Sequence, residues 1–272
     1  MLKQRVITGL IMAPIAVVGV FFLPLYGFAV FVGLIMLVSG WEWAQLAGYS
    51  GSSRVIYAGL LGLALPFIFF VPSVYILYIL IPGLLWWILA IFFVVSYPAF
   101  AKSWSSKVVR SIIGILVLVP AFAAMVQLKT YPDNNYLIVL LFLLIWGADI
   151  GAYFTGKAFG ERKLAARVSP GKSWAGFYGG LATALIIGSL MALVRPDTVQ
   201  LDSYEGMIFL GCCGFVAVVS VLGDLTISMF KRNAGVKDSS NLLPGHGGFL
   251  DRIDSLLSAG PLFALIVWVV TA

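Results

Sequence analysis

Long apolar runs make up nearly the whole chain, and they limit it to one kind of environment. Of its 272 residues, 61% are hydrophobic and only 10% are charged. A soluble domain carries about 25% charged residues, so this chain lacks the polar groups that a globular surface needs. A helix crosses a bilayer with about 20 apolar residues. The sequence therefore predicts an all-α, polytopic membrane protein.

Nine apolar segments are long enough to cross a bilayer as helices. They are Val6–Leu25, Phe28–Leu46, Val55–Val71, Val74–Val95, Ser111–Leu128, Tyr136–Tyr153, Trp174–Val194, Gly206–Leu225 and Ser255–Ala272. Only Pro72 and Ser73 separate the third segment from the fourth. The first segment follows Lys3 and Arg5 and resembles the apolar region of a signal peptide. Its length and the lack of a clear small-residue cleavage site favour a retained span.

The distribution of Lys and Arg gives an independent test of this count. With a cytoplasmic N-terminus, 15 of the 17 basic residues fall on the cytoplasmic side, and only Lys129 and Arg195 fall outside. Cytoplasmic loops carry such an excess. We therefore expect nine spans, a cytoplasmic N-terminus and an external C-terminus. Because basic residues beside spans also contact anionic head groups, the net charge of +6 predicts no nucleic-acid partner.

Acidic residues gather at one end of the predicted spans. Glu42, Asp149 and Asp224 fall inside spans, where an ionised carboxylate is costly and marks a functional site by default. All three lie in cytoplasmic halves, and Asp251 and Asp254 open the last span from the same side. Such a group suits a divalent cation that holds a polyphosphate. The alternative for these acids, Asp224 and Asp251 included, is an ion pair with Lys or Arg near a helix end or a position in the interface, as for Glu42. For Asp254 a helix N-cap is a further alternative.

Two predicted cytoplasmic loops, 154–173 and 226–254, are expected to carry the function. The second contains the only histidine of the chain, within the sequence PGHGG at positions 244–248. Glycine allows backbone N–H groups to approach phosphate without a Cβ in the way. Lys172 and Ser173 end the first loop at the start of the seventh span, where a helix N-terminus favours phosphate. A topology anchor is the alternative for Lys172.

The second loop resembles the signature of the phosphatidate cytidylyltransferases, also called CDP-diacylglycerol synthases. The pattern S-x-F-K-R-x4-K-D-x5-P-G-H-G-G-x2-D-R-x-D runs from Ser228 to Asp254. GADIGAYFTGKAFG and SPGKSWAG (Ser169–Gly176) resemble the sixth span and the following loop of the same family. One departure is Gly171, where the family commonly has lysine. The first half of the chain is similar only in its hydrophobic spans.

The resemblance implies an enzyme that transfers CMP from CTP to phosphatidate, giving CDP-diacylglycerol and pyrophosphate. It implies Mg²⁺ as the cofactor, with a second cation left open, and a homodimer. Residues 1–110 would form the N-terminal membrane helices, with spans one to four, and residues 111–272 the catalytic membrane region. The expected location is a bacterial inner membrane, with the active site facing the cytoplasm.

The resemblance also implies roles for individual residues. Asp224 and Asp251 are the expected metal ligands, with Asp149 and Asp254 as further candidates. The residues expected to bind the substrates are Lys172, Ser173, Lys231, Arg232, Lys237, Gly247, Gly248 and Arg252. The expected catalytic residues are Asp224, Asp251, Lys231 and His246. His246 is expected to donate a hydrogen bond to a phosphate rather than to remove a proton.

An ion-coupled transporter that uses the intramembrane acids is the main alternative function. Such a protein has its site near the bilayer midplane, with inverted repeats and broken helices. The acids of this chain lie at one end of their spans, and no internal repeat is evident in the sequence. A CDP-alcohol phosphotransferase is a further alternative, but the acid-rich motif of that family is absent.

Overall fold

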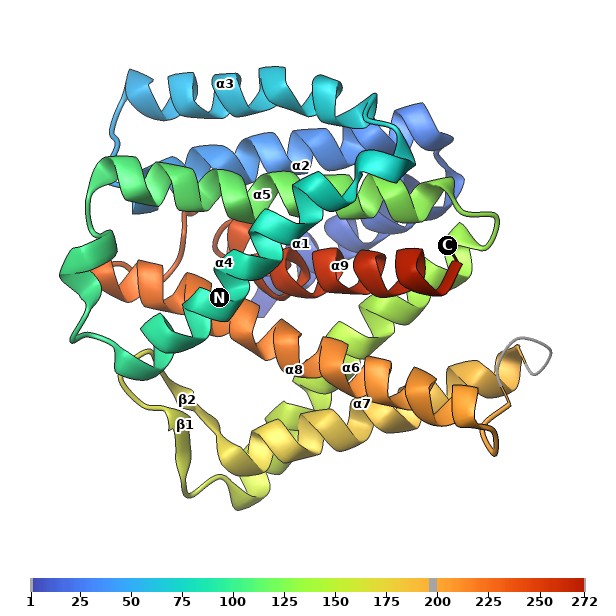
Figure 1. Ribbon diagram of the computed structural model, residues 1–272. Helices are drawn as coiled ribbons and strands as arrows, with labels where there is room; N and C mark the ends of the chain where they lie inside the picture. Colours follow the sequence, from blue (N-terminus) through green and yellow to red (C-terminus); the bar gives the residue numbers. More distant parts are fainter. Residues whose placement is uncertain (1, 196–199, 272) are drawn as a thin grey trace.

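The structure is a computed structural model that describes residues 2–195 and 200–271 (Figure 1). The side chains of residues 2–7, including those of Lys3 and Arg5, lie outside this description. The helices are α1 (Leu2–Val17), α2 (Leu25–Leu46), α3 (Ser52–Phe69), α4 (Leu77–Ser96), α5 (Lys107–Thr130), α6 (Asn134–Phe159), α7 (Trp174–Val194), α8 (Tyr204–Asn233) and α9 (Leu250–Thr271). Shorter elements are η1 (Val18–Phe22), η2 (Ser73–Tyr75), η3 (Ala101–Trp104), β1 (Lys163–Ala165) and β2 (Ser169–Ser173).

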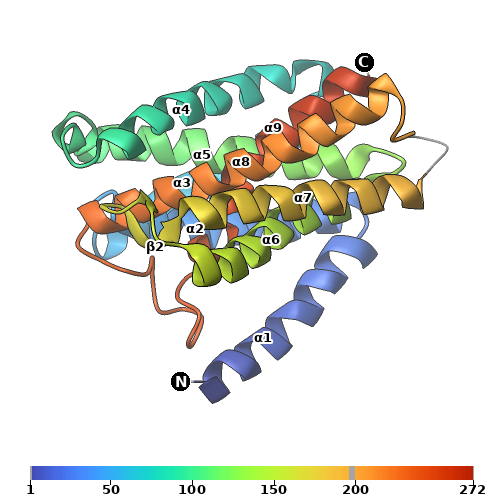
Figure 2. The same ribbon diagram turned by 90° about the horizontal axis from the view of Figure 1, so that it is seen from below.

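Eight helices of the described chain, α2 to α9, are long and apolar enough to cross a membrane. They confirm the predicted all-α polytopic class. The first predicted span differs from the other eight, because its apolar helical part is the shorter segment Thr8–Phe22. In Figure 2, α1 leans away from the bundle that the other helices form.

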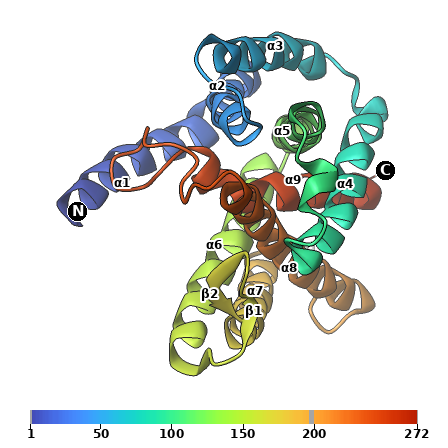
Figure 3. The same ribbon diagram turned by 90° about the vertical axis from the view of Figure 1, so that its left-hand side faces the viewer.

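Successive helices run up and down the bundle, so alternate connections share an end of the molecule. The connections α2–α3, α4–α5, α6–α7 and α8–α9 lie at the left of Figure 1. We call this the basic end, defined by residues 47–51, 97–106, 160–173 and 234–249 together with the adjoining helix turns. Helix α5 lies between α2 and α4, and it also packs on α9 (Figure 3). One hydrophobic core includes residues from both sides of residue 110, and the division of the chain there stays a prediction.

Helix α8 extends further than the sequence predicted. Hydropathy placed its end at Leu225, but the helix continues to Asn233. This last part is held by apolar packing, because Ile227, Met229 and Phe230 are buried. The Phe230 ring contacts three tryptophan rings, those of Trp43, Trp86 and Trp104. Lys231 and Arg232 therefore belong to a helix and not to a loop.

Helix α9 also differs from its predicted span, because it begins at Leu250 and not at Ser255. The second loop is therefore 234–249 rather than 226–254. Asp254 lies in the second turn of α9, so the N-cap alternative for this residue is wrong. The earlier start has a physical reason, since two buried carboxylates accept hydrogen bonds from the N–H groups that open the helix.

The loop before α7 contains a short antiparallel hairpin of β1 and β2, which the sequence did not predict. Lys163 pairs with Ser173 in its register. The Ser173 hydroxyl accepts a hydrogen bond from the Gly176 N–H at 3.1 Å and caps α7. Glycines bring α6 and α7 together, because a Cβ at Gly176 would lie 2.9 Å from the Ala152 carbonyl oxygen. The hairpin places Lys172 directly before the N-terminus of α7.

Candidate functional site

A charged cluster lies where the hairpin meets helix α8. Lys172 Nζ lies 2.6 Å from Asp224 Oδ2, and the two side chains are 22% and 28% exposed. The other oxygen, Asp224 Oδ1, accepts a hydrogen bond from the Ser228 hydroxyl at 3.1 Å. Because α8 stays helical here, the spacing of Asp224, Ser228 and Lys231 places them along one face. The two side chains are partly exposed, but the Lys172 Nζ atom itself is buried against Asp224.

A second ion pair is more deeply buried and joins α8 to α9. Lys231 Nζ lies 2.7 Å from Asp251 Oδ1, with the side chains only 10% and 4% exposed. Asp251 Oδ2 accepts hydrogen bonds from Ser239 N at 2.9 Å, from the Ser239 hydroxyl at 3.0 Å and from Gly248 N at 3.0 Å. Four donors therefore surround Asp251, and it holds the start of loop 234–249 against its end.

The remaining predicted acids surround the first ion pair. Asp149 on α6 interacts electrostatically with Lys172 and Asp224. Asp254 on α9 interacts electrostatically with Asp224, Lys231 and Lys172. Within the described residues, no group of three or more carboxylate, histidine or cysteine side chains is arranged to hold a metal ion. The structure thus brings Asp149, Asp224 and Asp254 near one another without closing a metal cage of protein ligands.

Three further cations predicted to bind phosphate lie around the cluster. The side chains of Lys237 and Arg252 are exposed and make no hydrogen bond or ion pair with any residue that the structure describes. They are free to contact an anionic ligand. Arg232 instead donates to the carbonyl oxygens of Val168 at 3.3 Å and Val236 at 3.4 Å. Arg232 therefore also ties the hairpin to the end of α8.

The PGHGG segment forms a tight turn at the tip of loop 234–249. Leu243 N donates to the Gly247 carbonyl oxygen at 2.8 Å, and His246 N donates to the Leu243 carbonyl oxygen at 2.8 Å. Gly245 and Gly247 have φ values of 77° and 83°, a region that favours glycine. His246 Nδ1 is buried and has no hydrogen-bond partner among the described residues. The role of His246 as a hydrogen-bond donor to a phosphate stays a prediction.

Gly248 has a different role from the expected approach to phosphate. Its N–H already donates to Asp251 Oδ2. A Cβ at this position would overlap the Ser239 hydroxyl and the carboxylate of Glu42. The absence of a side chain at Gly248 therefore lets the loop close over two buried carboxylates.

Replacing Gly248 with alanine is expected to destabilise the protein by about 1–3 kcal/mol, which is typical of overpacking a closed site. Chemical unfolding in detergent micelles measures this change. Gly59→Ala is the control, because a Cβ at Gly59 meets nothing within 4 Å. Equal stability of the Gly248→Ala and Gly59→Ala variants would contradict the packing role.

The sequence did not reveal two residues of the site, Ser239 and Ser240. They fall in the unspecified part of the family pattern, and both donate to Glu42, which the sequence had marked only as an acid inside a span. The one available signal was a pair of adjacent serines in a loop. That signal is common to many turns and specifies no partner.

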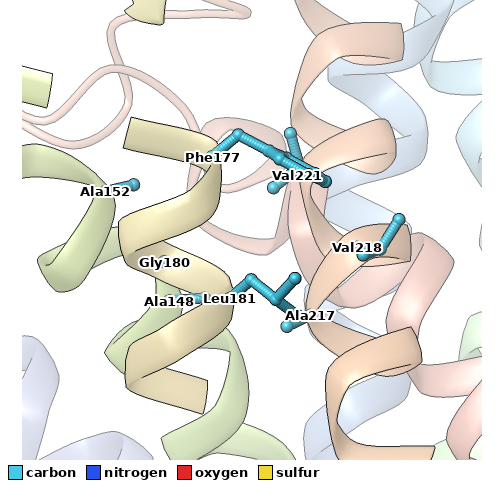
Figure 4. A pocket seen from close by; sticks show the side chains of 8 residues that line it. All are labelled: Ala148, Ala152, Phe177, Gly180, Leu181, Ala217, Val218 and Val221. Atoms are coloured by element: carbon cyan, nitrogen blue, oxygen red, sulfur yellow. The ribbon is translucent and has the colours of Figure 1, made fainter. Parts of the chain in front are cut away.

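An apolar pocket lies beside the charged cluster, between α6, α7 and α8 (Figure 4). It is a shallow hollow open to the outside, and its free volume of about 10 Å³ is close to what a single water molecule needs. The residues that line it are Ala148, Ala152, Phe177, Gly180, Leu181, Ala217, Val218 and Val221. Ala148 directly precedes Asp149, and Val221 lies one turn before Asp224. An acyl chain that lies along this apolar surface would therefore end beside the acids.

Fold and site together define a polytopic membrane protein with a charged ligand site at one end of its spans. Its sequence matches the Cytidylyltransferase family over residues 3–270. It is 48% identical over 269 residues to the phosphatidate cytidylyltransferase of Pseudomonas aeruginosa, covering 98% of this chain and 97% of the relative. It is 40% identical to the Haemophilus influenzae phosphatidate cytidylyltransferase over 286 residues, covering 97% and 98%. The chain belongs to the cytidylyltransferase family.

Proposed function

We propose that this chain transfers the cytidylyl group of CTP to phosphatidate and releases pyrophosphate, giving CDP-diacylglycerol. The relatives named phosphatidate cytidylyltransferase support this reaction, and the chain spans nearly their whole length. The observation in the structure that carries the proposal is the charged cluster of Lys172 and Asp224 beside an apolar pocket. A water-soluble polyphosphate and a lipid phosphate meet at such a boundary. Nothing favours the transporter, whose site would lie near the midplane.

The reaction needs charge neutralisation more than proton removal. A phosphate oxygen of phosphatidate forms a bond to the α-phosphorus of CTP, while the bond from that phosphorus to the departing pyrophosphate breaks. A phosphomonoester has its second pKa near 6, so the attacking oxygen is largely ionised at neutral pH. The site therefore has two tasks, to bring two anions together and to stabilise the negative charge on the leaving group.

Five cations are assigned to these tasks. Lys172 and Lys231 flank the acids and lie closest to the reacting phosphates. Lys237 and Arg252 are exposed and unpaired within the described chain, so they suit the outer phosphates of the nucleotide. Arg232 is the fifth cation, although its guanidinium also donates a hydrogen bond to the Val168 carbonyl oxygen in the hairpin. His246 Nδ1 completes the set as a hydrogen-bond partner of a phosphate.

The donor set fits Mg²⁺, which takes one or two carboxylates and fills its octahedron with water and phosphate oxygens. Asp224 is the main candidate ligand, because it is partly exposed and has Asp149 and Asp254 nearby. Asp251 is less suited, because four donors already occupy its oxygens. A bound Mg²⁺ ion would neutralise part of the negative charge of the phosphates. A second cation stays an open alternative.

The location of the protein and the side of the membrane that carries its site are part of the proposal. The chain is an integral membrane protein, and we place its basic end in the cytoplasm because positive charge favours that side. Bacterial relatives support a location in a bacterial inner membrane. The acyl chains of phosphatidate would enter beside the apolar pocket of α6, α7 and α8. The homodimer stays a proposal that the resemblance implies.

The test is transfer of label from radiolabelled nucleoside triphosphates to phosphatidate in detergent micelles, with and without Mg²⁺. We expect label from CTP in the lipid phase only when the metal is present, because the carboxylates otherwise repel the triphosphate. Micelles without phosphatidate are the control. Transfer that survives a chelator would contradict the metal assignment, and no transfer from any nucleotide by folded protein would contradict the function.

A further inference from the structure

Glu42 is a fully buried acid that no role in the reaction yet explains. It lies on α2, outside the sequence motifs that resemble the family signature, and its exposed fraction is 0%. Burial of a carboxylate is costly unless hydrogen bonds or a cation compensate for it. No ion pair to Glu42 within 4 Å is present in the described chain. Arg54 on α3 interacts with Glu42 electrostatically, and hydrogen-bond donors contact its oxygens directly.

All four donors to Glu42 come from the segment that carries the family signature. Its Oε1 accepts from the Ser240 hydroxyl at 2.5 Å and from Phe249 N at 3.0 Å. Its Oε2 accepts from the Ser239 hydroxyl at 3.0 Å and from Leu250 N at 2.6 Å. Two donors therefore precede the PGHGG turn and two follow it, where α9 begins. A carboxylate is also favoured there by the helix dipole.

Glu42 and Asp251 are linked through one hydroxyl group. The Ser239 oxygen lies 3.0 Å from Glu42 Oε2 and 3.0 Å from Asp251 Oδ2. A serine hydroxyl has one proton, so it donates to one carboxylate at a time. Asp251 in turn holds Lys231 Nζ at 2.7 Å. Glu42 on α2 is therefore connected to Lys231 on α8 through Ser239 and Asp251.

We infer that Glu42 is a positioning residue for the transfer reaction. It ties together the two sides of the PGHGG turn in loop 234–249 and, through Ser239 and Asp251, fixes the position of Lys231. The expected effect on catalysis rests on the proposed function. The loop closure itself is a structural statement and has its own test.

The variant that tests it is Glu42→Gln, which keeps the size of the side chain but replaces one acceptor oxygen by an NH₂ group. We expect kcat to fall about 10²-fold, the order that a 1 Å misplacement of catalytic groups produces. The KM for CTP should change less than threefold, because exposed Arg252 lies on α9 and outside the loop that Glu42 ties together. CTP binding should keep its stoichiometry, which shows that the active fraction has not simply dropped.

Amide hydrogen exchange of the peptide 239–250 gives a readout that does not depend on activity. Phe249 N and Leu250 N lose their carboxylate acceptor in Glu42→Gln, so exchange should become about tenfold faster, while other helices keep their rates. Glu42→Asp keeps the charge on a shorter side chain and should lie between wild type and Glu42→Gln in kcat and exchange. It serves as the test variant if Glu42→Gln does not fold.

Ser39→Ala is the matched control, because Ser39 is a buried residue one turn earlier on α2 whose hydroxyl has no partner within the described chain. It should match wild type in both measurements. A kcat for Glu42→Gln within threefold of wild type would overturn the inference, as would an unchanged exchange rate in 239–250. If wild type transfers nothing, the proposed function fails while the exchange result still decides the loop closure.

Discussion

Asp224→Asn is expected to lower kcat by about 10²–10³-fold or more while the protein remains folded. Removing one preorganised charge from an active site has an effect of this order. Asparagine keeps the shape of the side chain and an acceptor for the Ser228 hydroxyl, but it removes the charge that pairs with Lys172 and suits a cation. Because the Asp224 side chain is 28% exposed, the loss of its charge should not unfold the helix bundle.

Initial rates of CTP-dependent label transfer at saturating phosphatidate measure this effect, with the unfolding midpoint recorded in the same detergent. Asp202→Asn is the control, since Asp202 is an exposed acid in the connection before α8, away from the basic end. The Mg²⁺ concentration needed for half-maximal rate should rise in Asp224→Asn. A variant with wild-type rate and wild-type Mg²⁺ dependence would remove Asp224 from the metal site.

Lys231→Met is expected to lose both turnover and stability, since it leaves Asp251 charged and buried without its cation. Breaking a buried ion pair from one side costs about 3–5 kcal/mol. The double variant Lys231→Met with Asp251→Asn carries no unpaired buried charge and should recover much of that stability. Its turnover should stay lost, because the cation that faces the phosphates is still missing. Comparing the single and double variants thus separates the effect of the Lys231–Asp251 pair on stability from its effect on catalysis.

Chemical unfolding in mixed micelles and label transfer are measured on both variants. Arg195→Met is the control, because the Arg195–Asp133 ion pair lies exposed at the opposite end of the bundle. An exposed pair contributes at most about 1 kcal/mol. If Lys231→Met unfolds at the same denaturant concentration as wild type, the buried-pair argument is wrong. Restored turnover in the double variant would show that Lys231 has no part in the reaction.

Spans were predictable where hydrophobic length alone decides the structure. Trp174–Val194 was predicted with the bounds that α7 has, because a serine cap and a clear drop in hydropathy mark its ends. The prediction failed at Leu225, where hydropathy falls but the helix continues to Asn233. Phe230 packs among tryptophans from other helices, and no local pattern contains that contact. The hairpin of β1 and β2 was missed for a related reason, since each strand is only a few residues long.

The sequence by itself determined the membrane class, the end of the bundle that carries the charges, and the residue types of the site. Composition and charge spacing suffice for these, because the cost of placing polar groups in a bilayer depends on each segment alone. The tertiary structure decided which charges pair, Lys172 with Asp224 and Lys231 with Asp251. It also decided that Glu42 closes a loop about 200 residues away in the chain. Hydrogen bonds and ion pairs act over a few ångströms, so their partners are set by packing of the helices and not by distance along the sequence.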